Sequence, residues 1–255
     1  MGRLDGRVAV ITGAGGELMR AAAILFAKEG AKIVVADLVP ESGDNTVSMI
    51  REAGGEAVFI NTNVSKADDV RSMVKEAVAR YGRIDALVSG AGIAPSEVST
   101  VDCAEDVFDK ILAVNLKGVW LGMKYVIPEM LKTGGGSIVN IASIGAHRGV
   151  PGIAIYSAAK GGIISMSRVA HVEYGSRNIR INCISPGPIA TELLKRHHSA
   201  EEIKQLTRVT TRGRLGSPEE VASVALFLAS SESSHVMGQT IIMDGGMEAD
   251  GHVAS

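Results

Sequence analysis

The stretch RVAVITGAGGELMR, residues 7–20, decides the fold that this sequence predicts. It begins with a short apolar run rich in β-branched residues, continues through a turn that holds three glycines, and leads into a candidate helix. A strand, a tight glycine turn and a helix in this order are typical of a βαβ unit that binds phosphate, because glycine lets the backbone approach the ligand. We therefore expect a phosphate-binding turn at the end of this strand.

Six further apolar runs repeat the pattern along the chain, and each is followed by a longer amphipathic stretch. Runs with so little polar alternation are typical of strands that are buried on both faces of a parallel sheet, and the amphipathic stretches supply the crossover helices. We predict an α/β fold, Rossmann-like, with a single doubly wound parallel sheet of about seven strands and helices on both faces. The six runs are KIVVAD (32–37), AVFINT (57–62), IDALVS (84–89), SIVNIAS (137–143), IRINCIS (179–185) and TIIMDGG (240–246).

A chain of 255 residues can form one domain of this class, so we expect a single dinucleotide-binding and catalytic domain over residues 1–255. The longest helix is expected from about Asp102 to Leu131, with a bend near Pro128. One irregular stretch, residues 186–218, precedes the final helix and strand. A late excursion of this length is more often functional cover than idle loop, which predicts a substrate lid at about residues 188–216.

The composition argues against several classes of partner. The chain has 26 Lys plus Arg and 28 Asp plus Glu, a balance that produces no field to attract nucleic acid or an anionic membrane. Cys103 and Cys183 are far apart and have no Cys or His at metal-ligand spacing, so we expect no metal site. No apolar targeting segment is visible near residue 1. We expect a cytoplasmic protein that binds neither nucleic acid nor membrane.

The acid at the end of the second run predicts the cofactor. Asp37 follows Gly13 by 24 residues, near the spacing at which a carboxylate accepts hydrogen bonds from the adenosine ribose hydroxyls. Such a carboxylate repels a 2′-phosphate, so the sequence favours NAD. Residues 89–92, SGAG, form a second glycine-rich strand end, which either passes close to a ligand or is an ordinary strand-to-helix turn.

The first glycine turn departs from the dinucleotide-binding pattern. Glu17 and Met19 stand at the second and third glycine positions of the Gly-x-x-x-Gly-x-Gly register, and Leu18 ends the alternative Gly-x-Gly-x-x-Gly register. Repulsion between the Glu17 carboxylate and the pyrophosphate would weaken binding by about 1 kcal/mol. Met19 would overpack the contact between the helix and its strand, at a cost of roughly 1–3 kcal/mol. The backbone N–H groups remain, so we expect weakened NAD binding, and replacing both residues by glycine should lower the dissociation constant about tenfold.

Tyr156 and Lys160 are candidates for proton transfer. They lie four residues apart in GIAIYSAAKGGIISMSRV, residues 152–169, so a helix would place both on one face. A phenol has a pKa of about 10, and roughly 4 kcal/mol of stabilisation of its anion would bring the pKa to about 7. A lysine ammonium and the positive charge of an oxidised nicotinamide together could supply it. A solvated lysine beside a half-buried tyrosine is the alternative. Ser143, 13 residues before Tyr156, ends the fifth run and could orient a substrate oxygen.

With Ser143, Tyr156 and Lys160 in these positions, the whole chain resembles the short-chain dehydrogenase/reductase family, in its smaller, single-domain, NAD-dependent form. The resemblance implies that Tyr156 exchanges the hydroxyl proton of the substrate. It implies that Lys160 lowers the pKa of this phenol and binds the nicotinamide ribose, and that Ser143 orients the reacting oxygen. Asn115, in AVNLKG, matches an asparagine that holds a water in the proton relay.

The resemblance also implies the rest of the binding site. Asn63 and Val64 would contact adenine, and SPGPIAT, residues 185–191, would line the nicotinamide. The family usually carries Asn-Asn-Ala-Gly where this chain has residues 89–92, so a side-chain amide is missing at Gly90. The cofactor-binding residues that we expect are Gly13, Gly15, Gly16, Glu17, Leu18, Asp37, Leu38, Asn63, Val64, Ser89, Gly90, Ala91, Tyr156, Lys160, Pro186, Gly187, Ile189 and Thr191.

These residues and the resemblance predict an oxidoreductase that transfers a hydride between NAD(H) and a secondary alcohol or ketone. The resemblance also implies that the long helix and the Tyr156 helix bury surface between subunits, so we expect a homotetramer or homodimer. One alternative is a cofactor-independent lyase or dehalogenase-like enzyme on the same fold, although related dehalogenases would carry arginine at Lys160. The other is a non-catalytic NAD-binding protein. Steroid, cyclic polyol, sugar and hydroxy-acid derivatives all remain open as substrates.

Overall fold

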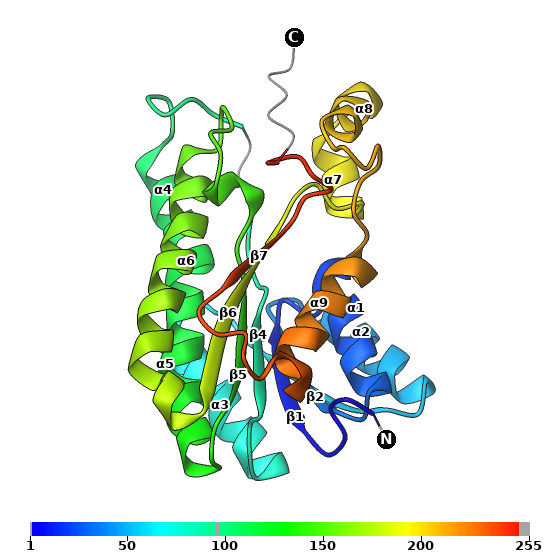
Figure 1. Ribbon diagram of the computed structural model, residues 1–255, viewed down its shortest axis with the longest axis vertical. Coiled ribbons are helices and arrows are strands. Elements are labelled where there is room, and N and C mark those ends of the chain that lie inside the picture. The colour runs from blue at the N-terminus through cyan, green and yellow to red at the C-terminus, as the bar shows by residue number, and fades with distance from the viewer. Residues whose placement is uncertain (1, 95–96, 250–255) are drawn as a thin grey trace.

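The computed structural model describes residues 2–94 and 97–249, which form one seven-stranded sheet in the order β3-β2-β1-β4-β5-β6-β7 (Figure 1). Every strand pair is parallel. Each of the seven apolar runs coincides with one strand to within a few residues, so the predicted doubly wound parallel sheet is confirmed. The strands are β1 (Val8–Thr12), β2 (Lys32–Asp37), β3 (Glu56–Asn61), β4 (Ala86–Ser89), β5 (Gly136–Ile141), β6 (Ile179–Pro186) and β7 (Thr240–Met243).

Helices cover both faces of the sheet (Figure 1). On one face pack α1 (Glu17–Lys28), α2 (Pro40–Glu52) and α9 (Pro218–Ala229). On the other pack α3 (Ala67–Tyr81), α5 (Gly118–Lys132) and α6 (Ala154–Tyr174), and α4 (Glu105–Ile111) contacts α6. Short 3-10 turns follow at η2 (Ile144–Ala146), η3 (Gly175–Arg177) and η4 (Ser231–Ser233).

The two faces of the sheet explain why the apolar runs show little alternation. In β1, Ala9 and Ile11 belong to the core beneath α1 and α9, whereas Val10 belongs to the core beneath α3, α5 and α6. In β2, Ile33 and Val34 divide between the two cores in the same way. Side chains on a strand alternate between faces, so a strand covered on both faces needs apolar residues at successive positions.

The strand order places the candidate site residues at the carboxyl ends of the strands. The chain winds outward from β1 to β3 and then returns to the other side of β1 with β4. Ligands of such sheets bind beyond the carboxyl ends of the strands, where the order reverses. At this point Thr12, the last residue of β1, pairs with Ala36 on one side and with Ser89 on the other.

The helix predicted over residues 102–131 differs from the observed one in two respects. It starts later, at Glu105, and it is interrupted by a π-helical segment, η1 (Leu112–Lys117), between α4 and α5. Pro128 lies inside α5. The longest α-helix among the described residues is instead α6, with 21 residues. π-Helical turns inside helices are frequent at functional sites, and this one contains Asn115.

The irregular stretch before α9 contains two short helices, α7 (Glu192–His197) and α8 (Ala200–Arg208). A backbone bridge between Ile189 and Gly216 closes its base. Figure 1 shows α7 and α8 beyond the carboxyl end of β6, on the side of α1 and α9. The stretch that carries α7 and α8 therefore lies at the carboxyl ends of the strands, where a ligand of such a sheet would bind.

The described residues contain neither a membrane-spanning helix nor a cluster of potential metal ligands. Within residues 2–94 and 97–249, no helix combines the length and the apolar character needed to cross a membrane. The same residues contain no group of three or more His, Cys, Asp and Glu side chains that could hold a metal ion.

Candidate active site

Ser143 and Tyr156 meet beyond the carboxyl end of β5. Ser143 follows β5 by two residues and caps η2, where its Oγ accepts a hydrogen bond from the N–H of Gly145 at 3.2 Å. Tyr156 lies in the first turn of α6. The Ser143 hydroxyl lies near the phenol of Tyr156 and favours its ionised form. The structure therefore brings together two of the side chains that the sequence singled out.

Lys160 lies one helical turn further along α6 and is buried, with 5% of its surface exposed. Its Nζ donates a hydrogen bond to the carbonyl oxygen of Ile141 at 2.8 Å and lies 5.6 Å from the centre of the Tyr156 ring. Burial lowers the pKa of Lys160 to about 8, because water no longer stabilises the ammonium. At neutral pH the group still carries its proton, so a positive charge lies beneath the phenol.

The pKa of Tyr156 is raised above its usual value. Burial is the larger cause, and the nearby Ser143 hydroxyl lowers the pKa by less. The depressed pKa predicted for Tyr156 is therefore not a property of the protein groups by themselves. A protonated phenol can donate a proton to a developing alkoxide, whereas abstraction of a proton from an alcohol needs a further positive charge nearby.

Asn115 is completely buried in the π-helical segment. Its Oδ1 accepts a hydrogen bond from the N–H of Ile93 at 2.8 Å, and its Nδ2 donates one to the carbonyl oxygen of Ile93 at 2.9 Å. The side chain thus holds the loop that follows β4. The expected water-holding role of Asn115 stays a prediction, and the side-chain contacts show a positioning role in addition.

The loop at residues 89–93 joins the catalytic side to the glycine turn. Gly92 faces Asn115 and Lys160, since a Cβ added there would lie 3.2 Å from the Oδ1 of Asn115 and 3.8 Å from the Nζ of Lys160. At its other end, the N–H groups of Gly90 and Ala91 point to the Oγ1 of Thr12 at 3.2 and 3.3 Å. This strand end therefore contacts both parts of the candidate site, and its close approach to a ligand stays a prediction.

The turn after β1 has the shape of a dinucleotide-binding turn. Gly13 has a φ of +73°, and a Cβ there would lie 2.7 Å from the Cα of Ala91, so the position requires glycine. Gly16 provides no side-chain cap for α1. The first N–H groups of α1, including that of Leu18, are the kind of donors that hold a pyrophosphate. These residues fit a nicotinamide dinucleotide.

Asp37 stands at the end of β2 beside this turn. Its Oδ2 accepts a hydrogen bond from the N–H of Gly15 at 2.8 Å, and its Oδ1 accepts one from the N–H of Val39 at 3.0 Å. A Cβ at Gly15 would lie 2.9 Å from the Cγ of Asp37. The absence of a side chain at position 15 therefore brings the carboxylate against the turn, where the adenosine ribose of a dinucleotide is expected.

The structure corrects the interpretation of Met19 as an overpacked residue. Met19 is 1% exposed, and its side chain fills the space beside Gly90, where an added Cβ would fall closer than 3.0 Å to the Sδ and Cγ atoms of Met19. Glu17 also differs from expectation. Its Oε2 accepts a hydrogen bond from the N–H of Glu192, the first residue of α7, at 2.6 Å. The carboxylate therefore contacts the excursion that carries α7 and α8.

The residues expected at the adenine end lie near the ends of β2 and β3. Leu38 is 59% exposed. The Oδ1 of Asn63 accepts hydrogen bonds from the N–H and the hydroxyl of Ser65. Val64 is buried and packs against Gly118 of α5. Val64 thus contributes to the core beneath the loop, and an adenine contact by Asn63 or Val64 stays a prediction.

The residues expected along the nicotinamide follow β6. Pro186 is the last residue of β6 and is buried. Gly187 allows close approach of the chain after β7, since a Cβ would lie 2.8 Å from the Cα of Asp244. Ile189 packs into the core beneath α1 and α9. Thr191 caps α7, with its Oγ1 accepting a hydrogen bond from the N–H of Leu194.

Two sets of contacts near the carboxyl ends of the strands were not predicted from the sequence. Thr46 donates a hydrogen bond to the carbonyl oxygen of Ala14, and Arg20 contacts both Thr46 and the carbonyl oxygen of Gly15. Both side chains come from helices, so no motif in the turn itself signals them. The one signal in the sequence is that Arg20 follows Gly16 by four residues, about one helical turn, so that its side chain can reach back to the glycine turn.

The second set involves the segment after β7. Its Gly245 carbonyl accepts a hydrogen bond from the N–H of Arg212, and its Met247 carbonyl accepts one from the Nη1 of Arg148. His147 in turn contacts the Ser185 hydroxyl at 2.9 Å through its Nε2. The segment thus connects the chain after α8 with the chain after Ser143. It lies far from both in sequence, which is why no local pattern revealed it.

The chain is similar throughout to proteins of one family. A family profile described as "Enoyl-(Acyl carrier protein) reductase" matches residues 16–248. The chain is 40% identical to a 3-oxoacyl-(acyl-carrier-protein) reductase FabG of Thermotoga maritima, over 96% of this chain and 99% of that protein. It is 36% identical to a cyclohexanol dehydrogenase of an Acinetobacter species, over 95% of each chain.

Solved structures agree with these relatives. The structure matches that of levodione reductase with a TM-score of 0.93 and 34% identity, over 97% of this chain and 99% of that one. It matches a 7α-hydroxysteroid dehydrogenase, in complex with NADH and 7-oxo glycochenodeoxycholic acid, with a TM-score of 0.92 and 32% identity, over 96% and 95% of the two chains. This chain therefore belongs to the short-chain dehydrogenase/reductase family and is an oxidoreductase.

Proposed function

We propose that the protein is an NAD-dependent dehydrogenase or reductase that interconverts a small secondary alcohol and its ketone. The observation that carries the proposal is the position of the buried ammonium of Lys160, 5.6 Å from the centre of the Tyr156 ring, with the Ser143 hydroxyl near the same phenol. Two hydroxyl groups that converge above a fixed positive charge can hold one substrate oxygen and exchange its proton.

Each residue has a distinct part in this proposal. The nicotinamide supplies the hydride acceptor or donor. Tyr156 gives its proton to the oxygen of a ketone or takes it from an alcohol, and Ser143 holds the same oxygen in place. Lys160 stabilises the phenolate by its charge, and Asn115 fixes the 89–93 loop against it. The hydrogen bond from Lys160 to Ile141 keeps the ammonium in position.

NAD rather than NADP is supported by Asp37. Its carboxylate lies against the N–H of Gly15, at the strand end where the adenosine ribose binds in this fold. A 2′-phosphate carries close to two negative charges at neutral pH and would meet this carboxylate directly. The proposed cofactor contacts are those that the sequence predicts, with Gly13 and the N-terminus of α1 at the pyrophosphate.

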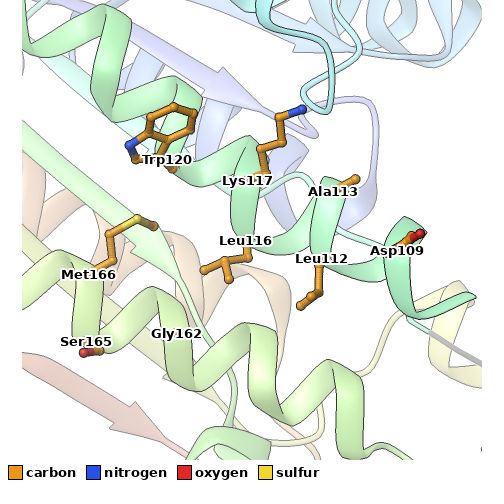
Figure 2. A pocket seen from close by; sticks show the side chains of 9 residues that line it. All are labelled: Asp109, Leu112, Ala113, Leu116, Lys117, Trp120, Gly162, Ser165 and Met166. Atoms are coloured by element: carbon orange, nitrogen blue, oxygen red, sulfur yellow. The ribbon is translucent and has the colours of Figure 1, made fainter. Parts of the chain in front are cut away.

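We also propose a homotetramer or homodimer. Figure 2 shows a groove between the η1–α5 segment and α6, lined by residues 109, 112, 113, 116, 117, 120, 162, 165 and 166. Its lining is mainly apolar and includes Trp120, which is 42% exposed. On α6, Val169 and Val172 are 57% and 81% exposed. An apolar surface of this kind on one face of a protein is typical of a subunit interface. Light scattering at working concentration tests it, and a monomer would refute it.

The position of the excursion supports a substrate lid. α7 and α8 lie beyond the carboxyl end of β6 (Figure 1), the strand that pairs with β5, and Ser143 follows β5 by two residues. The segment after β7 connects the excursion with Arg148. The single domain, the small-molecule substrate and the cytoplasmic location complete the proposal. Cyclic ketones and alcohols are the first substrates to test, because the similar proteins include a cyclohexanol dehydrogenase and levodione reductase.

The deciding experiment is a panel of cyclic, steroid and hydroxy-acid alcohols, assayed with NAD by the absorbance of reduced nicotinamide, with each corresponding ketone assayed with NADH. We expect turnover of at least one pair and none with Tyr156→Phe. Binding of NAD without turnover of any compound would favour a non-catalytic NAD-binding protein. Conversion of a substrate without any nicotinamide would favour a cofactor-independent enzyme.

A further inference from the structure

We propose that Met19 is a positioning residue, whose side chain holds the 89–93 loop between the cofactor turn and the catalytic residues. The chain departs from the family pattern at Met19, where a glycine is usual, and at Gly90, where an asparagine is usual. These two departures lie 71 positions apart in sequence, yet the residues are in direct contact. The part of this inference that concerns the cofactor rests on the proposed NAD binding.

Space is the first argument. Met19 is 1% exposed, so its side chain is enclosed by protein. A side chain at position 90 would overlap the thioether, because even its Cβ would fall closer than 3.0 Å to both Sδ and Cγ. The same Cβ would lie 3.2 Å from the backbone oxygen of Thr12, which cannot move aside as a side chain can. Met19 and Gly90 are therefore complementary in volume, and either change alone would be unfavourable.

The connections of the loop are the second argument. Gly90 and Ala91 donate to the Thr12 hydroxyl, directly before the cofactor turn. Three residues after Gly90, the side-chain amide of Asn115 bonds both the N–H and the carbonyl oxygen of Ile93. Between them, Gly92 faces Lys160. Met19 contacts Gly90, at the anchor of this loop that is bonded to Thr12.

The chemistry of methionine suits this position. Its unbranched, flexible thioether fills irregular gaps, and it comes from α1, whose first turn is proposed to bind the pyrophosphate. A contact from α1 to the 89–93 loop therefore fixes the cofactor turn and the loop beside Lys160 relative to each other. A glycine at position 19 would leave a cavity there instead, because position 90 has no side chain to fill it.

A double-mutant cycle tests the inference with Met19→Ala, Gly90→Ala and the double variant. We expect each single variant to lower Tm by roughly 5–10 °C, through a cavity in one case and a clash in the other. The dissociation constant for NAD should rise roughly three- to tenfold in each. In the double variant the methyl group of residue 90 occupies the vacated space, so both quantities should return most of the way to wild type.

Met73→Ala is the matched control, because Met73 is equally buried but lies in α3, in the core on the other side of the sheet. It should lower Tm to a similar extent and leave the NAD dissociation constant unchanged. Met19→Leu should retain both stability and affinity. The steady-state KM for NAD should rise more than kcat falls in Met19→Ala, since the chemical groups stay intact.

Additive losses of Tm in the cycle would refute the steric complementarity of Met19 and Gly90. An unchanged NAD dissociation constant in Met19→Ala, or an equal rise in Met73→Ala, would refute the positioning role. Wild-type protein that binds no NAD would instead refute the proposed function, and the Tm cycle, measured without cofactor, would still decide the complementarity.

Discussion

The proposed catalytic side of the site, at the end of β5 and the start of α6, differs from the proposed cofactor side, at the turn between β1 and α1. On the catalytic side, Ser143, Tyr156 and Lys160 follow the family pattern, and each contributes a particular atom. On the cofactor side, two of the three glycine positions hold Glu17 and Met19, and the turn still keeps a left-handed Gly13 and a free helix N-terminus.

The difference shows which requirements are chemical and which are steric. A phenolic proton or an ammonium charge can be provided only by the residue that carries it. Empty space can be provided by a different residue, and here Gly90 provides it for Met19. The backbone N–H groups of the turn are the same for any side chain. The cofactor side can therefore vary in sequence while its shape is kept.

The largest expected effect concerns the catalytic side. Tyr156→Phe should lower kcat by on the order of 100-fold to 10,000-fold, because it deletes the oxygen that exchanges the proton. The NAD dissociation constant, measured by isothermal titration, should stay within about twofold of wild type. A variant that keeps more than about a tenth of the wild-type rate would show that Tyr156 is not the acid or base.

The second prediction concerns the pH dependence of stability that Lys160, on the same side of the site, produces. The pKa of Lys160 is lowered to about 8 in the folded protein, whereas it is about 10.4 in an unfolded chain. Below pH 8 the ammonium is present in both states. Between these two values the unfolded chain binds more protons, so this group adds stability as the pH rises, up to about 3 kcal/mol.

Urea unfolding of wild type and Lys160→Met across this range measures the effect. The difference in unfolding free energy, wild type minus variant, should increase from pH 8 to above pH 10. A flat difference would show that the lysine is not buried as an ammonium. The variant should also lose both activity and NAD affinity, and a loss of activity alone would contradict the proposed contact with the nicotinamide ribose.

A smaller effect is expected at Asp37 on the cofactor side. Asp37→Asn removes the negative charge and keeps an oxygen that can accept the hydrogen bond from Gly15. The ratio of kcat/KM for NAD over NADP should fall by about tenfold, the equivalent of roughly 1.4 kcal/mol of removed repulsion. A wild-type enzyme that uses both cofactors equally well would overturn the role of this carboxylate.

The smallest effect is expected at Glu17, which connects the cofactor turn to α7. Glu17→Ala removes the acceptor for the N–H of Glu192 and should speed amide hydrogen exchange at residues 192–195. The KM for the substrate should rise about two- to fivefold, the equivalent of one exposed hydrogen bond. Glu17→Gln keeps an acceptor and should behave like wild type. Unchanged exchange in the alanine variant would show that this contact does not hold α7.

Much of the molecule could be predicted from the order of residues alone. The seven apolar runs predict the seven strands because parallel strands covered on both faces need apolar side chains at successive positions. The four-residue spacing of Tyr156 and Lys160 predicts their common helix face, and Gly13 predicts the tight turn after the first strand. These are local properties, determined by backbone geometry and by the period of a helix or strand.

Other features depended on packing between distant segments. No local sequence pattern predicts the π-helical segment around Asn115. Ile93, to which Asn115 is hydrogen-bonded, lies in the distant loop after β4. The fit of Met19 against Gly90 and the contact of Glu17 with α7 join residues that the sequence separates widely. Whether a methionine overpacks a site or fills it depends on the volume of its neighbours in space. The sequence by itself therefore determined the elements, their order and the reactive groups, whereas only the tertiary structure decided which departures from the pattern compensate each other.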